Sequence, residues 1–162
     1  MLPDPTRPLP AGLSIRVATR DDVGSIISLI MAGDILGRGV DTLDAAARGD
    51  YLAAFDEIAA SAHETLYVAE LAGKVVGTFQ ISLSRTLAHR GRTRATIESV
   101  HVSPDVRGKG VGEAMMRAAL DLAKGEGAGL VQLTSNKKRV DAHRFYERIG
   151  FQKSHEGFKW EF

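Results

Sequence analysis

One stretch decides how this chain folds: Val102-Ser103-Pro104-Asp105-Val106-Arg107-Gly108-Lys109-Gly110-Val111-Gly112. The residues before it, 94–102, are typical of a strand, and residues 111–124 place apolar side chains at intervals of three and four, which predicts a helix. The glycines leave the backbone N–H groups of the turn unobstructed at the start of that helix. Such a turn binds phosphate oxygens, and Arg107 and Lys109 add the positive charge that a pyrophosphate requires.

Two other phosphate-binding loops do not fit this stretch. A Walker A loop requires Ser or Thr after its Gly-Lys pair, whereas Gly110 follows Lys109. The dinucleotide pattern Gly-x-Gly-x-x-Gly, started at Gly108, requires glycine at position 113, where Glu113 stands. A glycine-rich turn without a ligand remains the alternative at this point.

Periodicity along the rest of the chain predicts strands that alternate with helices. We expect strands at 14–17, 65–71, 74–84, 94–102, 130–135, 152–155 and 158–162. We expect helices after an N-cap at Thr19, at 42–62, at 111–124 and at 141–149. This order indicates an α/β fold with a mixed sheet. Residues 14–162 are expected to form one domain, and residues 1–13, which hold four of the five prolines, a flexible tail.

Composition excludes several classes of protein. The 162 residues contain no cysteine, which excludes a disulfide scaffold, a thiolate nucleophile and cysteine-ligated zinc. The five histidines are scattered without the spacing of metal ligands, so no metal is expected. No apolar run reaches the roughly 18 residues of a membrane span, and the first residues lack the pattern of a signal peptide. We therefore expect a cytoplasmic protein that does not bind a membrane.

Charge is distributed unevenly along the chain. The formal net charge is +1, but residues 21–70 hold ten acidic residues against two arginines, and the positive charge is concentrated elsewhere. This asymmetry is typical of a protein that binds a polyanion with one part and faces a cation with another. The alternative is that two solvated faces differ in sign by chance.

Read as Arg-x-x-Gly-x-Gly, the residues Arg107, Gly110 and Gly112 resemble the coenzyme A pyrophosphate loop of the GNAT superfamily of N-acetyltransferases. Asn136 and the run Asp141–Phe151 are similar to the family's Asn…Ala-x-x-Phe-Tyr-x-x-x-Gly-Phe segment. The resemblance covers roughly residues 14–162. It implies a single-domain GNAT-like fold with a mixed, mostly antiparallel sheet of six to seven strands flanked by about four helices. Acetyl-CoA then lies where the fourth strand splays from the fifth.

The resemblance also implies which residues hold acetyl-CoA. The pyrophosphate is expected on Arg107, Gly108, Lys109, Gly110, Val111 and Gly112. The backbone of Val100, His101 and Val102 is expected to contact the pantetheine and the acetyl carbonyl. Asn136 is expected to bind the pantetheine arm and Arg144 the adenosine 3′-phosphate. A turn role for Asn136 and a solvated side chain for Arg144 remain the alternatives.

Acetyl transfer to an amine requires two proton transfers. A lysine-like amine has a pKa near ~10.4, so the neutral form at pH 7 costs roughly 4.6 kcal/mol, and the leaving thiolate departs more easily once protonated. The resemblance implies that Tyr146 is the general acid on the coenzyme A sulfur. The alternative is a core tyrosine beside Phe145. Because no cysteine or Gly-x-Ser-x-Gly elbow is present, we expect direct attack in a ternary complex.

Glu98 is the candidate base, acting through a water. Strand alternation places it on one face with Val100 and Val102 and predicts partial burial. The alternative is an ion pair across the strands with Arg90, Arg92 or Arg94. His101 is expected on the opposite face, as a polar side chain rather than a catalyst.

The acceptor is expected to be a small cationic amine, because residues 21–70 fall where the family builds its acceptor side; a peptide amine is the alternative. A non-catalytic acyl-CoA sensor of the same fold is the competing function. A nucleic-acid binder ranks last, because the basic residues lack interleaved aromatics. A homodimer is consistent with the family.

Overall fold

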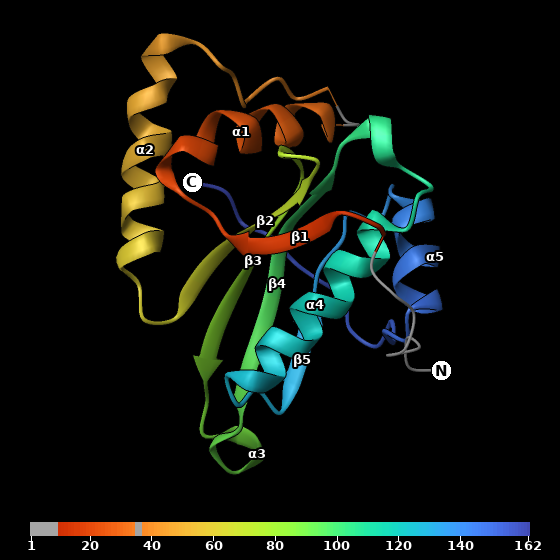
Figure 1. Cartoon of the computed structure of the whole chain (residues 1–162). Helices are drawn as coiled ribbons and strands as arrows, with labels where there is room; N and C mark the ends of the chain where they lie inside the picture. Colours follow the sequence, from red (N-terminus) through yellow and green to blue (C-terminus); the bar gives the residue numbers. More distant parts are fainter. Residues whose placement is uncertain (1–9, 35–36) are drawn as a thin grey trace.

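The structure, a computed structural model, describes residues 10–34 and 37–162 (Figure 1). Five strands form one sheet in the order β1 to β5: β1 Leu13–Val17, β2 Glu64–Leu71, β3 Lys74–Arg85, β4 Thr93–Val102 and β5 Leu130–Leu133. The helices are α1 Val23–Ala32, α2 Ala45–Ala60, α3 Ala88–Gly91, α4 Val111–Gly125 and α5 Val140–Arg148. Short 3₁₀ turns occupy Arg20–Asp22 and Pro104–Val106.

The sheet confirms the predicted α/β fold. Strands β1 to β4 pair antiparallel in sequence order, and β5 pairs parallel with β4, so the sheet is mixed and mostly antiparallel. The parallel pair requires the crossover through α4, which the apolar spacing of residues 111–124 predicted.

The strand count is lower than predicted. Residues 152–155 and 158–162 form no strand in the described part of the chain, so the sheet there has five strands instead of six or seven. Their alternation is that of a strand, but a strand also requires an edge with which to pair. The helix count rises to five because α3 forms at the tip of the β3–β4 hairpin. The tail prediction for residues 1–9 lies outside the described residues, and Leu13 is already a buried residue of β1.

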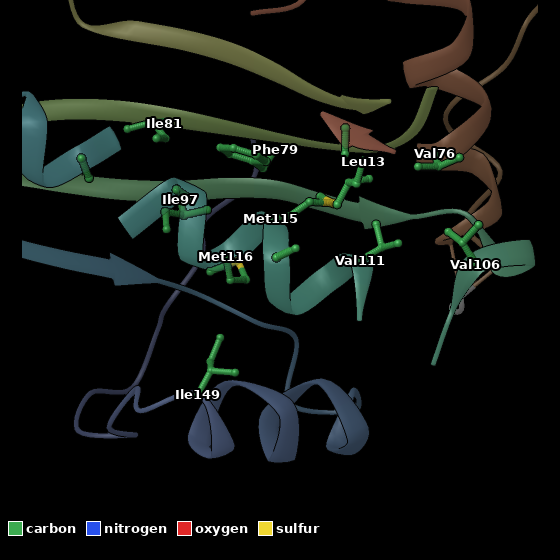
Figure 2. Close-up of a cluster of buried hydrophobic side chains, with 14 of the residues drawn as sticks. Leu13, Val76, Phe79, Ile81, Ile97, Val106, Val111, Met115, Met116 and Ile149 are labelled. Carbon is green, nitrogen blue, oxygen red and sulfur yellow. The ribbon is translucent and has the colours of Figure 1, made fainter. Parts of the chain in front are cut away.

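Helices cover both faces of the sheet. On one face, Met115 and Met116 of α4 are fully buried in one cluster with Phe79 and Ile97 of the sheet (Figure 2). Ile149, at the end of α5, belongs to the same cluster. Figure 1 shows α1 and α2 grouped together, away from α4. Their apolar side chains pack around Val68 on the other face of the sheet: Val23, Ile26, Ile27 and Phe55.

Helix α2 is less buried than its sequence predicts. The spacing of residues 42–62 predicts one inner face made of Leu43, Ala46, Ala47, Tyr51, Ala54, Phe55 and Ile58. Of these only Phe55 is buried, and Leu43 lies before the helix and is exposed. Small alanines repeat on every side of this helix, so the spacing alone does not define one apolar face.

An ion-pair network joins the start of α1 to the sheet. Arg16 of β1 donates to Asp22 at 2.7 Å and to Glu70 of β2 at 2.9 Å. Asp22 also accepts from the backbone and hydroxyl of Thr19 at 2.7 and 3.0 Å, which confirms the predicted N-terminal cap. The Arg16 guanidinium and these hydrogen bonds lower the pKa of Asp22 to about 2. Asp22 therefore remains charged in the folded protein at neutral pH.

We predict that Asp22→Asn lowers the free energy of unfolding at neutral pH by about 2 kcal/mol, because the lowered pKa of Asp22 reports stabilisation of its charged form. That stabilisation is complete above the unfolded pKa, near pH ~4, and is lost as the pH falls toward about 2. Urea unfolding at both ends of this range measures it. Asp21→Asn, at the exposed neighbour, is the matched control. A difference in the free energy of unfolding between Asp22→Asn and wild type that persists at low pH would contradict this explanation.

Candidate functional site

A β-bulge in β4 opens the site. Gln80 of β3 pairs with Glu98 and Thr78 pairs with His101, so the two residues between them, Ser99 and Val100, oppose Phe79 alone. Ser99 has a φ of 49°, a left-handed conformation that the extra residue imposes. The pairing of β4 with β5 ends at Ile97 and Leu133, one residue before Glu98. The two parallel strands therefore diverge where the bulge begins.

A cleft of about 200 Å³ lies where these strands diverge. One wall is formed by residues 97–101 of β4 and the other by Leu133, Thr134 and Ser135. Arg139 and Tyr146, from the start and the body of α5, complete the lining. The structure therefore brings Glu98, His101 and Tyr146, which are far apart in the sequence, to one cleft. This is the divergence of the fourth and fifth strands that the sequence resemblance implied.

The bulge changes which side chains share a face with Glu98. Because Gln80 and Thr78 lie two residues apart on β3, their partners Glu98 and His101 project from the same face of the sheet. Val100 and Val102 instead pack against the cluster on the α4 side. The predicted grouping of Glu98 with the two valines is therefore wrong, since one extra residue reverses the alternation beyond it.

Glu98 differs from its prediction in exposure as well. Its side chain is exposed, not partly buried. Within the described residues it forms no ion pair with Arg90, Arg92 or Arg94, so the cross-strand alternative is not formed there. A carboxylate that lines a cleft without a cationic partner is available to accept a proton.

His101 lines the cleft together with Glu98, an arrangement that the sequence did not indicate. Burial lowers the pKa of His101, and Arg139 and Arg107 lower it further, against an opposing effect of Asp41. The imidazole is therefore neutral at neutral pH. Its ring packs against Gly33 at the end of α1, where an added Cβ would lie 2.9 Å from Cε1. The position of the bulge decides that this ring lies on the same face as Glu98, and the alternation of residues in the sequence does not reveal a bulge.

Tyr146 presents a protonated hydroxyl to the cleft. Its ring packs edge-on against Phe145, with centroids 5.3 Å apart, and against Phe151 at 6.0 Å. Burial raises the pKa of Tyr146, so the hydroxyl retains its proton at neutral pH. The hydroxyl has no hydrogen-bond partner in the described part of the chain. The ring therefore packs beside Phe145, as the alternative to the acid role expects, while Tyr146 also lines the cleft; its role as general acid stays a prediction.

The glycine-rich loop leaves its amides free. Four backbone N–H groups here donate to no acceptor among the described residues: those of Gly108, Gly110, Val111 and Gly112. The backbone of Lys109 is the exception, since it donates to Val106 at 3.3 Å. Gly108 and Gly110 have φ angles of 76° and 82°, which explains why glycine stands at both positions. Free amides at the start of α4 form a site for an anion.

Gly112 has no such conformational reason to be glycine. A Cβ there would lie 3.6 Å from Val102 and 3.7 Å from Phe145, which are ordinary contact distances. The chain itself therefore has room for a side chain at this position, so the glycine is consistent with the close approach of a ligand to the backbone.

The other side chains expected to bind acetyl-CoA, those of Asn136 and Arg144, differ in how far the structure leaves them available to a ligand. The side-chain oxygen of Asn136 accepts from the backbone of Lys138 at 2.9 Å, so one of its two acceptor positions is used in the turn, and its amide nitrogen remains for a ligand. The side chain of Arg144 is 74% exposed, pairs with Asp141 at 3.5 Å and does not line the cleft. Ser135 lines the cleft, and its buried hydroxyl has no hydrogen-bond partner among the described residues, so this hydroxyl is available to a ligand.

Part of the acidic charge of residues 21–70 is neutralised in the fold. Asp22 and Glu70 pair with Arg16, and Asp56 pairs with Arg20 at 3.1 Å. Both arginines lie just outside the counted segment, so a count along the sequence overstates the local charge.

Residues 10–34 and 37–162 include no helix with the length and apolar character of a membrane span. The same residues contain no group of three or more side chains that could hold a metal ion.

Comparison with known proteins relates the whole chain to acetyltransferases. The profile of the acetyltransferase (GNAT) family matches residues 40–151. An aminoalkylphosphonate N-acetyltransferase of Salmonella typhimurium is 33% identical over 87% of this chain and 86% of its own length. Two solved structures share the fold. A transcriptional regulator of Bacillus halodurans has a TM-score of 0.87 and 38% identity over 93% of this chain and 99% of that one. A predicted acetyltransferase of Clostridium acetobutylicum, solved with acetyl-CoA, has a TM-score of 0.70 and 18% identity over 92% and 96%.

We predict that Gly112→Ala folds normally but binds coenzyme A at least about tenfold more weakly, because the new Cβ occupies ligand space and not protein space. Thermal unfolding with and without coenzyme A measures both properties. Gly125→Ala, at the other end of α4, where an added Cβ would meet nothing within 4 Å, is the control. Equal coenzyme A affinity for Gly112→Ala and wild type would show that the ligand does not approach this backbone.

Proposed function

Because the chain belongs to the acetyltransferase (GNAT) family, we propose that it transfers the acetyl group of acetyl-CoA to the primary amine of a small cationic molecule, by direct attack in a ternary complex. Membership follows from the profile match over residues 40–151 and from 33% identity across most of a curated relative. The chain is an N-acetyltransferase, and acetyl-CoA is its cosubstrate. The acceptor and the mechanism are the proposal.

One observation carries the mechanism: the protonated hydroxyl of Tyr146 and the unpaired carboxylate of Glu98 line the same cleft. In the proposed reaction, Glu98 accepts a proton from the amine through a water, with the neutral ring of His101 beside it on the same face. The neutral amine nitrogen then bonds to the acetyl carbon as the carbon–sulfur bond breaks, and it releases its second proton to solvent, from which Tyr146 regains a proton after it has donated. Tyr146 gives its proton to the leaving thiolate, and free N–H groups of the β4 backbone stabilise the charge on the carbonyl oxygen.

The residues that hold acetyl-CoA are proposed from the same geometry. The free amides of Gly108, Gly110, Val111 and Gly112 suit the pyrophosphate, with Arg107 and Lys109 as flanking charges. The backbone of residues 100–102 and the amide of Asn136 suit the pantetheine arm. Arg144 lies outside the cleft, so its proposed role is limited to the adenosine end of acetyl-CoA.

The proposed acceptor is a cationic amine. The acidic residues of the α1–α2 region that the fold leaves unpaired with arginine include Asp34 and Asp41, and Asp41 is close enough to influence His101. The aminoalkylphosphonate enzyme and a glucosamine 6-phosphate N-acetyltransferase of Trypanosoma brucei, 32% identical over 49% of this chain, support a small amine as the acceptor class. Coenzyme A release on a panel of polyamines, aminoglycosides, lysine and aminoalkylphosphonates tests it. Turnover of neutral amines, or of amines with an anionic group such as the aminoalkylphosphonates, without turnover of the cationic amines would overturn the cationic class.

We predict that Tyr146→Phe retains coenzyme A affinity and lowers kcat by about 100-fold or more, because only the proton donated to the thiolate is lost. Steady-state coenzyme A release and thermal shift measure the two effects. Tyr67→Phe, which removes a hydroxyl from a ring stacked on Phe79 in the core, is the control. An unchanged kcat would remove the acid role, and binding without turnover in the wild type on every amine would favour an acyl-CoA sensor.

We predict that Glu98→Gln lowers kcat/KM by about 100-fold near neutral pH and that the deficit narrows toward pH ~10, where the free amine supplies its own neutral form. A pH profile of both enzymes measures this. His101→Gln is the comparison. Because the pKa of His101 is lowered from its ordinary value of 6.5, the imidazole becomes protonated only at pH values below 6.5. Any part of the pH profile of kcat/KM that His101 controls therefore lies at acidic pH. A larger deficit in His101→Gln than in Glu98→Gln would transfer the base role to His101.

The name of the Bacillus halodurans relative raises nucleic-acid binding as a different function. DNA or RNA binding whose affinity falls steeply with added salt would support it.

A further inference from the structure

Arg139 is a cation on the wall of the cleft that the proposed reaction does not yet use. It is the N-cap residue of α5, with a φ of −87° and a ψ of 63°, and it lines the cleft together with Glu98 and Tyr146. The residue is partly buried, and within the described residues its side chain forms no hydrogen bond or ion pair. A guanidinium that loses hydration without gaining a carboxylate partner is costly, so its place in the cleft requires an explanation.

Helix geometry directs Tyr146 toward Arg139. The two residues are seven positions apart, which is close to two turns, so both lie on one side of α5. Side chains in a helix lean toward its N-terminus, and the tyrosine hydroxyl therefore leans toward the turn that holds the arginine. Electrostatics agree with this arrangement, since burial raises the pKa of Tyr146 and the charge of Arg139 opposes that effect.

The proposed reaction creates an anion beside this cation. When Tyr146 gives its proton to the leaving thiolate, the O–H bond breaks, an S–H bond forms, and the electron pair stays on the phenolate oxygen. Burial disfavours the phenolate, and the hydroxyl has no hydrogen-bond partner among the described residues. Of the described residues that line the cleft, only Arg139 carries a permanent positive charge. It is therefore the group available to stabilise this anion.

The same cation keeps the charge of the cleft balanced throughout the reaction. Before the transfer, Arg139 shares the cleft with the carboxylate of Glu98. Once Glu98 has accepted a proton from the amine, its negative charge is lost, and the phenolate of Tyr146 takes its place. One cation thus accompanies one anion before and after the carbon–sulfur bond breaks, which limits the electrostatic cost in a site of low polarity.

We propose that the guanidinium of Arg139 stabilises the Tyr146 phenolate as the thiolate leaves, and that it does not hold the phosphates of coenzyme A. This inference rests on the proposed acetyl transfer with Tyr146 as its acid. Arg139 itself neither gains nor loses a proton, because a guanidinium keeps its charge at the pH of catalysis. Arg107 and Lys109, which flank the glycine-rich loop, remain the cations proposed for the pyrophosphate.

Kinetics test whether Arg139 acts through Tyr146. Arg139→Gln is expected to lower kcat for coenzyme A release by about tenfold or more and to retain the thermal shift with coenzyme A, while Arg139→Lys retains most of kcat. In the Tyr146→Phe background, Arg139→Gln is expected to change kcat by less than about twofold, because no phenolate forms there. Lys138→Gln, which removes the charge of the exposed neighbouring residue, is the matched control.

Titration separates a charge effect from a loss of structure. In Arg139→Gln the pKa of Tyr146 and that of His101 are both expected to rise, by about 0.5 to 1, while Asp41 and Arg107 continue to act on His101. Tyrosinate absorbance, with Tyr146→Phe to identify the signal, and proton NMR of the imidazole measure the two values. A loosened, more hydrated cleft would instead lower the pKa of Tyr146 toward 10 and raise that of His101 toward 6.5. The direction of the Tyr146 change therefore distinguishes the two effects without any measurement of turnover.

Four results would overturn the proposal. Full kcat in Arg139→Gln, where Tyr146→Phe is slow, would leave the acid role intact and remove Arg139 from it. Weaker coenzyme A binding with unchanged kcat at saturation would assign Arg139 to the phosphates. A lowered pKa of Tyr146 in Arg139→Gln would show a structural role. Full kcat in Tyr146→Phe would remove the acid step of the proposed function itself, and the role of Arg139 with it.

Discussion

The extra residue in β4 is the constraint on which the site depends. Between Glu98 and His101 the strand accommodates two residues opposite Phe79 alone, and Ser99 adopts a left-handed conformation to do so. Bulges increase local twist, and β4 stops pairing with β5 at Ile97, immediately before this point. The consequence is a cleft lined by backbone groups that a regular ladder would have consumed. The core around Met115 and Phe79 holds the paired half of the sheet rigid, so the divergence occurs at a fixed place.

The same low-polarity environment acts in opposite directions on two residues of the cleft. Burial disfavours a charged form whatever its sign, so it raises the pKa of Tyr146 and lowers that of His101. The result is a neutral hydroxyl that can give a proton and a neutral imidazole that can accept one. Arg139, near both, opposes the first effect and reinforces the second. A pair of titratable groups adjusted in this way is typical of sites that perform acid–base chemistry.

Much of the fold and part of the site could be predicted from the sequence, for identifiable reasons. The apolar spacing of α4 and the glycines before it are local signals, and the structure places both where they were expected. The face occupied by Glu98 could not be predicted, because alternation assumes one residue per position and a single inserted residue reverses it. The charge of residues 21–70 was also misleading, since Arg16 and Arg20 form ion pairs with three of its carboxylates and offset two negative charges from outside the segment. Residues 158–162 have the alternation of a strand, but pairing depends on an edge that no local pattern specifies.

The proposed division of roles between backbone and side chains explains how such a fold can keep one cosubstrate while its acceptors differ. The groups proposed for the pyrophosphate are the amides of Gly108, Gly110, Val111 and Gly112, which every residue type except proline supplies, so the loop needs glycine mainly for its shape. A structure only 18% identical, solved with acetyl-CoA, retains the fold at a TM-score of 0.70. The acceptor side is built instead from side chains of the α1–α2 region and from residues such as His101, which can change without disturbing the loop. Selection on the acceptor can therefore act on one face of the cleft while backbone geometry preserves the other.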